Sequence, residues 1–285
     1  MSHPAPPPPY QPPASTASPA ATPGGPGIDL RGTASIPLAR LVQVELRKAL
    51  DTLASFWFVV GLAIIVVGTE VLLTIAIIVQ EEPSTPGDYA SVASFITGIG
   101  LPVLAIMLVT TEWSQRTAMV TFTIEPRRER VLLAKYAVCL VLTIATVLLA
   151  LVLGFVCAGV CELALPDLTT WEVDWSVIAG FFITQVLAMT LGFALACLLL
   201  NTPAAIVGFF VYRLLPLLVF SAIGGFFEWF QDVQPYIDFE VAKGPLYDLS
   251  LDSAEELLQL LTSGLLWLGL PLGFGLWRIL RAEVK

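Results

Sequence analysis

Histidine and closely spaced cysteines are scarce in this 285-residue chain. Its single histidine is His3, and its four cysteines form no Cys-x-x-Cys motif. Because protein metal sites are mostly built from clustered His, Cys and carboxylate ligands, we expect no metal site. The chain also has no Gly-x-x-x-x-Gly-Lys-Ser/Thr motif, the loop that holds ATP phosphates in many ATPases. We therefore assign no catalytic residues and expect no enzymatic activity in this chain.

Charge is scarce as well, and apolar residues take its place. Only 13% of the residues are charged, 56% are hydrophobic, and the mean hydropathy is +0.83. A soluble domain of this size carries more charge and less apolar surface. The chain is therefore predicted to be an all-α integral membrane protein.

Cys157 and Cys161 are close enough in sequence to suggest a disulfide, but buried thiols are the simpler interpretation.

The order of segments along the chain predicts six membrane spans behind a polar tail. Residues 1–34 are rich in Pro, Ala, Ser and Gly, which predicts a disordered cytoplasmic tail without a signal peptide. Residues 35–55 alternate apolar and basic positions at helical spacing, which is typical of a helix lying in the membrane interface. An amphipathic extension of the first span is the alternative. The six-span domain covers 35–285, with spans near 56–79, 91–110, 131–160, 175–200, 203–227 and 262–280.

The distribution of Lys and Arg between the loops gives the orientation. Four of these residues precede the first span, five lie between Thr111 and Lys135, and three follow the last span. Because short basic loops stay in the cytoplasm, both termini are predicted to be cytoplasmic and the protein a multi-pass plasma-membrane protein. Most acidic residues fall in the opposite loops. The longest of these, 228–261, is predicted to contain a short helix that dips back toward the membrane and a capping box at Ser253 and Glu256.

Two charged residues lie within predicted spans. Glu70 lies about 21 Å from the cytoplasmic end of the first span, and Arg213 about 15 Å from that of the fifth. Because an isolated charge at such depth is costly, we expect the two residues to form an intramembrane charge pair. The pair would be an interhelical clamp or part of a transport path. Pro216 follows Arg213 and predicts a helix kink.

Between the second and third spans the sequence resembles the ABC-2 type permeases, which are the membrane subunits of ATP-binding-cassette exporters. The resemblance rests on Glu112-Trp113, Thr117, Pro126 with Arg130, and Lys135, and the C-terminus resembles actinobacterial members of that family. It implies a cytoplasmic coupling helix that inserts into a separate ATPase subunit. It also implies a complex of two permease copies with two ATPase copies, in which the ATPase binds ATP-Mg and this chain needs no cofactor. No nucleic-acid partner is expected.

The segment between those spans would dock through an aromatic and apolar anchor with charges beside it. The residues predicted to contact or couple to the ATPase are Glu112, Trp113, Arg116, Thr117, Met119, Val120 and Phe122. The bases Arg127, Arg128, Arg130 and Lys135 are explained by a simpler role, anchoring the third span at the lipid headgroups. The alternative function is an ion-coupled secondary transporter that uses Glu70 and Arg213. An intramembrane enzyme is disfavoured, because the spans contain one glutamate and no histidine.

Overall fold

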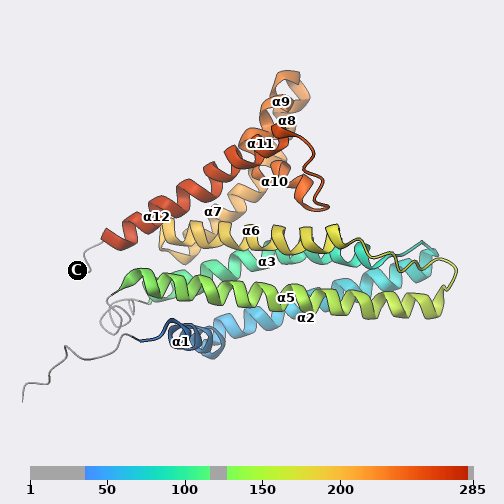
Figure 1. Ribbon diagram of the computed structural model, residues 1–285, viewed down its shortest axis with the longest axis horizontal. Helices are drawn as coiled ribbons and strands as arrows, with labels where there is room; N and C mark the ends of the chain where they lie inside the picture. The colour runs from blue at the N-terminus through green and yellow to red at the C-terminus, as the bar shows by residue number, and fades with distance from the viewer. Residues whose placement is uncertain (1–35, 116–126, 282–285) are drawn as a thin grey trace, which may run out of the picture. The chain divides into compact units, whose positions relative to one another are not determined.

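Long apolar helices make up most of the protein, as the sequence predicts. The computed structural model describes residues 36–115 and 127–281, which are helical except for the turns between helices (Figure 1). The predicted tail lies outside these residues. Six helical segments of the described part are long and apolar enough to cross a membrane. They are α2 (Leu53–Gln80), α3 (Pro86–Ser114), α5 (Arg128–Ala164), α6 (Trp175–Leu199), the run α7 (Thr202–Leu215), η2 (Pro216–Phe220) and α8 (Ser221–Phe226), and the run α11 (Ala254–Gly264), η4 (Leu265–Gly269) and α12 (Leu270–Arg281).

These six segments match the six predicted spans, with most ends shifted outward by a few residues. The third is the longest, with 37 residues in α5. At about 1.5 Å per residue it is roughly 55 Å long, well beyond the ~30 Å of a hydrocarbon core. The predicted third span, 131–160, is likewise the longest of the six predicted spans.

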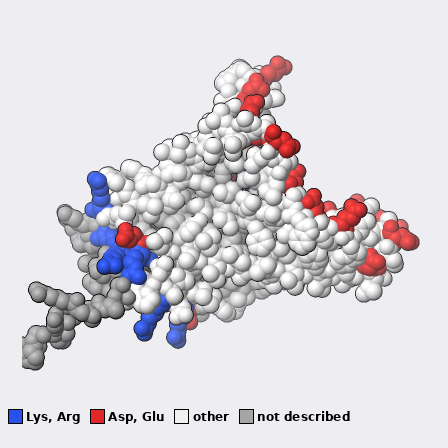
Figure 2. All heavy atoms as spheres, viewed as in Figure 1, with Lys and Arg blue, Asp and Glu red and all other residues white. Residues whose placement is uncertain are grey.

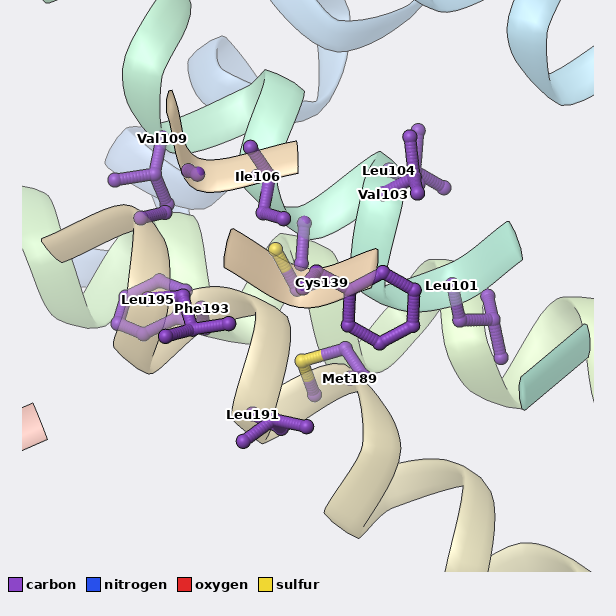
Figure 3. Packing of buried hydrophobic residues seen from close by; sticks show 14 of the residues in the cluster. Leu101, Val103, Leu104, Ile106, Val109, Cys139, Met189, Leu191, Phe193 and Leu195 are labelled. Carbon is purple, nitrogen blue, oxygen red and sulfur yellow. The ribbon is translucent and has the colours of Figure 1, made fainter. Parts of the chain in front are cut away.

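Helices α3 and α6 form the centre of the helical domain and make its most extensive contact. Their buried side chains meet those of α5, as Figure 3 shows for Leu101, Ile106, Cys139, Met189 and Phe193. A glycine allows the two backbones to come close: a Cβ on Gly192 would lie 2.3 Å from the Pro102 carbonyl oxygen. Small residues at such crossings are typical of helix packing in membranes, where close backbone approach replaces hydrophobic collapse. Helices α2 and α5 pack on α3, and α7 and α12 pack on α6.

The amphipathic stretch forms a separate helix, α1 (Leu38–Asp51). Thr52 interrupts the helix with extended backbone angles, φ −78° and ψ 117°, before α2 begins at Leu53. The helix of this stretch therefore does not run unbroken into the first span. The face of α1 that turns toward the other helices carries Glu45 and Ala49, which are both buried.

The long loop before the last span is folded into short helices. It contains α9 (Glu228–Ile237), α10 (Phe239–Ala242) and the 3₁₀ turn η3 (Gly244–Leu246), followed by α11. The predicted capping box is confirmed, because Ser253 caps the backbone of Glu256 and the Glu256 side chain bonds back to Ser253. The turn after η3 lies directly against α6, where a Cβ on Gly180 would lie 2.2 Å from the Tyr247 carbonyl oxygen.

Charges of opposite sign gather at opposite ends of the long helices (Figure 2). Lys and Arg concentrate where α2 and α5 begin and where α12 ends, which we call the basic end; α3 and α6 also end there, and α7 begins there (Figure 1). Asp and Glu concentrate at the acidic end, where α2 and α5 finish and α3, α6 and α11 start. All four cysteines are buried free thiols, so Cys157 and Cys161 form no disulfide.

Candidate functional site

Four charged side chains from three helices form a closed ring at the basic end, which we call the charge ring. Glu45 and Lys48 come from α1, Glu112 from the last turn of α3, and Lys135 from the start of α5. Because α3 and α5 flank residues 116–126 in the sequence, the ring joins the two helices on either side of the segment predicted to contain a coupling helix. Residues 116–126 themselves lie outside the described residues.

Acidic and basic groups alternate around the charge ring. The Lys48 ammonium lies 2.7 Å from Glu45 Oε1 and 3.0 Å from Glu112 Oε1. The Lys135 ammonium lies 2.7 Å from Glu45 Oε2 and 3.3 Å from Glu112 Oε2. Each carboxylate oxygen therefore faces an ammonium, and each ammonium bridges two carboxylates from different helices. Charge-assisted contacts of this kind are among the stronger polar interactions in proteins.

The helical spacing of the sequence explains how the charge ring forms. Glu45 and Lys48 are three residues apart and so share one face of α1. Lys135 interrupts an apolar run and is only 6% exposed, and Glu45 is 8% exposed. Lys135 also lies 3.3 Å from the Leu108 carbonyl oxygen of α3. A buried charge is stable only with such partners, so the ring fixes the spacing of α1, α3 and α5.

The ring shifts the pKa values of its two α1 residues, Glu45 and Lys48. Burial by itself favours neutral Glu45, but the charges and hydrogen bonds of Lys135 and Lys48 outweigh it and lower the pKa of Glu45 below 4.5. Burial also opposes the charge on Lys48, but its hydrogen bonds and charge interactions with Glu45 and Glu112 raise the pKa of Lys48 above 10.5. Both groups are therefore charged at neutral pH.

Further contacts tie the ends of α3 and α5 to the rest of the domain. Thr110 and Ser114 of α3 each contact the Thr202 hydroxyl at the start of α7, at 2.7 and 3.0 Å. On α5, Arg128 donates to the Ile279 carbonyl of α12 at 2.7 Å, and Arg130 donates to the Ile36 carbonyl before α1 at 2.5 Å. The helix ends on both sides of residues 116–126 are thus linked to α1, α7 and α12.

The four bases predicted to anchor the third span behave differently from one another. Lys135 is buried in the charge ring, so its predicted role as a headgroup anchor is wrong. Its long side chain reaches carboxylates inside the protein instead of the lipid surface. Arg128 and Arg130 bind backbone carbonyls of neighbouring segments, and Arg127 stands immediately before α5.

Two of the predicted docking residues lie in the described part of the chain, and both contact this protein itself. Glu112 belongs to the charge ring, and Trp113 packs against the main apolar core. Arg116, Thr117, Met119, Val120 and Phe122 lie outside the described residues. Sequence reasoning missed Glu45 and Lys48. The signal was an acid at position 45 within the apolar stripe formed by Leu41, Val42 and Ala49 on α1.

The predicted charge pair between Glu70 and Arg213 is wrong. Arg213, in the last turn of α7, forms its ion pair with Glu240 of α10 and lies over the Phe95 ring at 5.8 Å. Lys243 and the Tyr212 hydroxyl bind the same carboxylate at 2.8 and 3.0 Å. The similar depth of Glu70 and Arg213 along their spans did not predict the pairing, because the loop after α9 returns to α7 and supplies a nearer partner for Arg213.

The ion pairs of Glu240 explain its ionisation. Burial favours neutral Glu240, but Lys243 and Arg213 outweigh that effect and lower the pKa of Glu240 below 4.5.

Pro216 opens the π-helical segment η2 directly after α7, and η4 is a second π-helical segment in the last span. A wider helical turn accommodates a residue that lacks a backbone N–H, so this segment stands where the sequence predicts a kink.

The described residues contain no group of three or more His, Cys, Asp and Glu side chains placed to hold a metal ion. Comparison with protein-family models and with curated proteins gives no match. The resemblance to ABC-2 permeases therefore rests only on the sequence, at the residues between Glu112 and Lys135 and at the C-terminus.

Proposed function

We propose that this chain is the permease subunit of an ATP-binding-cassette exporter. In this proposal it lies in the plasma membrane with both termini in the cytoplasm, and two permease copies form the translocation path. Two copies of a separate ATPase bind ATP-Mg and attach through the segment between α3 and α5. Six apolar helical segments and the short motifs around that segment support this assignment.

The observation that carries the proposal is the charge ring at the base of residues 116–126. A segment that receives force from an ATPase needs ends that cannot fray independently of the helices they lead into. The ring links the end of α3 to α5 and α1, and Thr202 links it to α7. Movement of the segment would therefore act on several helices together.

The separation of charge supports the orientation. The basic end carries α1 and the ends of α3 and α5 that flank residues 116–126 in the sequence, and the acidic end carries α9, α10 and the start of α11. Because Lys and Arg near short loops favour the cytoplasmic side, the basic end is the one that an intracellular ATPase would meet. The alternative of a secondary transporter built on a Glu70–Arg213 pair loses its basis, since Arg213 is paired with Glu240.

The test is co-expression with an ATP-binding-cassette ATPase from the same genome, chosen first from the reading frames next to this gene, followed by affinity purification of the tagged permease. We expect the ATPase to co-purify with the wild-type chain. Phe122→Asp should reduce the amount recovered by at least about tenfold, because it places a charge in the predicted apolar anchor. It should reduce permease-stimulated ATP hydrolysis to a similar extent.

Two controls separate docking from folding. Phe122→Asp should leave the melting temperature of the isolated permease unchanged, and Phe155→Leu, at the far end of α5, should leave ATPase recovery unchanged. Full recovery of the ATPase with Phe122→Asp, or no ATPase bound to the wild-type chain, would contradict the proposed function.

A further inference from the structure

Glu70 is a buried acid that the proposed function does not use. It lies on α2 and is 1% exposed, and neither of its carboxylate oxygens has a hydrogen-bond partner among the described residues. It packs between α2, α3 and α5, beside Tyr89 and Gly154: its Oε2 lies 3.9 Å from the point that a Cβ on Gly154 would occupy. It lies ten residues before the end of α2, so it is roughly 15 Å from the acidic end.

An ionised carboxylate in this position would lack compensation. Charges inside a membrane protein are normally paired, hydrogen-bonded or hydrated. The one basic residue expected to pair with Glu70 is occupied by Glu240. The favoured state of Glu70 is therefore the neutral acid, in contrast to the buried Glu45, which is salt-bridged.

The groups facing Glu70 suit a proton better than a metal cation. The Thr74 hydroxyl donates to the Glu70 backbone carbonyl at 2.8 Å and lies 3.3 Å from the Tyr89 hydroxyl. Tyr89 from α3 in turn contacts the Cys161 thiol of α5 at 3.1 Å, with Cys157 in the same cluster. Calcium and similar cations take six or more oxygen ligands, often from several carboxylates. The two hydroxyls and two thiols of this cluster do not provide such a set, and none of them is hydrogen-bonded to the Glu70 carboxyl group.

A small recess lies beside Gly154, the α5 residue next to the Glu70 carboxylate, and its lining reaches the acidic end. Gly154 and Ala90 line a small pocket together with Gly87 and Asp174. Its free volume of about 10 Å³ is close to the minimum for one water molecule. Gly87 and Asp174 also line an open groove of about 760 Å³ that carries Asp88 and Glu172. Acidic walls of this kind raise the local concentration of protons and other cations.

We propose that Glu70 is a proton-exchange site, a carboxylic acid buried between α2, α3 and α5 that gains and loses its proton through the recess at the acidic end. The inference is independent of the proposed export function and needs no ATPase. Its observations are the two unpartnered oxygens, the missing side chain at Gly154 and the recess that this glycine lines.

Infrared difference spectroscopy on the full chain in lipid vesicles tests the proposal. Spectra are recorded while the buffer is exchanged between about pH 5 and pH 9. This range is wide enough to follow a buried carboxyl group as it gains and loses its proton. We expect a protonated-carboxyl band that weakens at high pH and shifts when D₂O replaces water. Glu70→Gln should abolish that band, whereas Glu228→Gln, which removes an exposed acid, should leave it unchanged.

Labelling with dicyclohexylcarbodiimide gives a second readout. The acid proton moves to a carbodiimide nitrogen, the carboxyl oxygen adds to the central carbon, and an acyl shift leaves a stable N-acylurea that retains the whole reagent. Peptide mass spectrometry should find this adduct on Glu70, with a yield that falls as pH rises. The salt-bridged carboxylates Glu45 and Glu240 should stay unlabelled and act as internal controls.

Two results would overturn the inference. Absence of any Glu70-dependent carboxyl band in the difference spectra across this pH range, in protein whose melting temperature matches the wild type, would show that Glu70 does not gain or lose its proton. A band that is present but never shifts in D₂O would show a proton that does not exchange.

Discussion

Replacing Lys135 by methionine removes the most buried charge of the charge ring at similar side-chain length. The substitution leaves Glu45 and Glu112 with Lys48 alone, whose side chain is 44% exposed. Removing one partner of a buried ion pair costs about 3 to 5 kcal/mol, because the remaining charge stays buried without compensation. For a domain of this size that corresponds to a fall in melting temperature of roughly 6 to 20 °C.

The pH dependence distinguishes this cause from a simple packing defect. In the wild type the pKa of Glu45 is lowered, so its contribution to stability is present above pH 4.5 and is lost as the pH falls through the lower folded value. Without Lys135, burial dominates and the pKa of Glu45 should rise above 4.5. Acidification from pH 7 toward pH 5 should then stabilise Lys135→Met, while the wild type stays unchanged over the same interval.

Thermal unfolding of the purified chain in detergent, followed at several pH values, measures both effects. Adding Glu45→Gln to Lys135→Met should recover at least about 1 kcal/mol, because the double variant leaves the Lys48–Glu112 pair balanced. Arg47→Gln is the matched control: it removes a base from the exposed pair with Asp51 on the same helix and should shift the melting temperature by less than about 2 °C. A melting temperature and pH profile of Lys135→Met equal to those of the wild type would refute the reasoning.

Two further predictions concern other contacts of the domain. Arg213→Gln and Glu240→Gln should each destabilise the protein by about 3 kcal/mol, whereas Glu70→Gln should not lower the melting temperature; equal losses for Glu70 and Arg213 would contradict the pairing seen here. Gly192→Ala should cost about 2 kcal/mol or more, because its Cβ would lie 2.3 Å from the backbone of α3, and Gly61→Ala, with open space around it, should cost nothing.

The sequence predicts the membrane architecture well because length, hydropathy and charge at helix ends are local properties. The six apolar segments match the predicted spans, and the capping box at Ser253 starts α11 as expected. The separation of the two charge signs was also visible, since it depends only on which loop holds each Lys and Arg. None of these features requires knowledge of which helices are neighbours.

Side-chain pairing could not be obtained in the same way. Depth along a span placed Glu70 and Arg213 together, but it contains no information on helix order or on the rotation of each helix about its axis. The partner of Arg213 comes from α10, a four-residue helix in a loop whose return toward α7 has no pattern of its own in the sequence. The charge ring could have been predicted in part, because Glu45 within an apolar stripe and Lys135 within an apolar run both required a buried partner.

The charge ring changes how the docking hypothesis must be tested. Glu112 looks like a docking residue in the sequence, but its carboxylate binds Lys48 and Lys135 of the same chain. Glu112→Arg would place a third positive charge beside two ammonium groups, so loss of an ATPase after that change would report a disrupted α1–α3–α5 junction as readily as a lost contact. Trp113 has the same ambiguity, because it packs against the apolar core. Substitutions between Arg116 and Phe122, checked against the melting temperature of the isolated permease, separate the two causes.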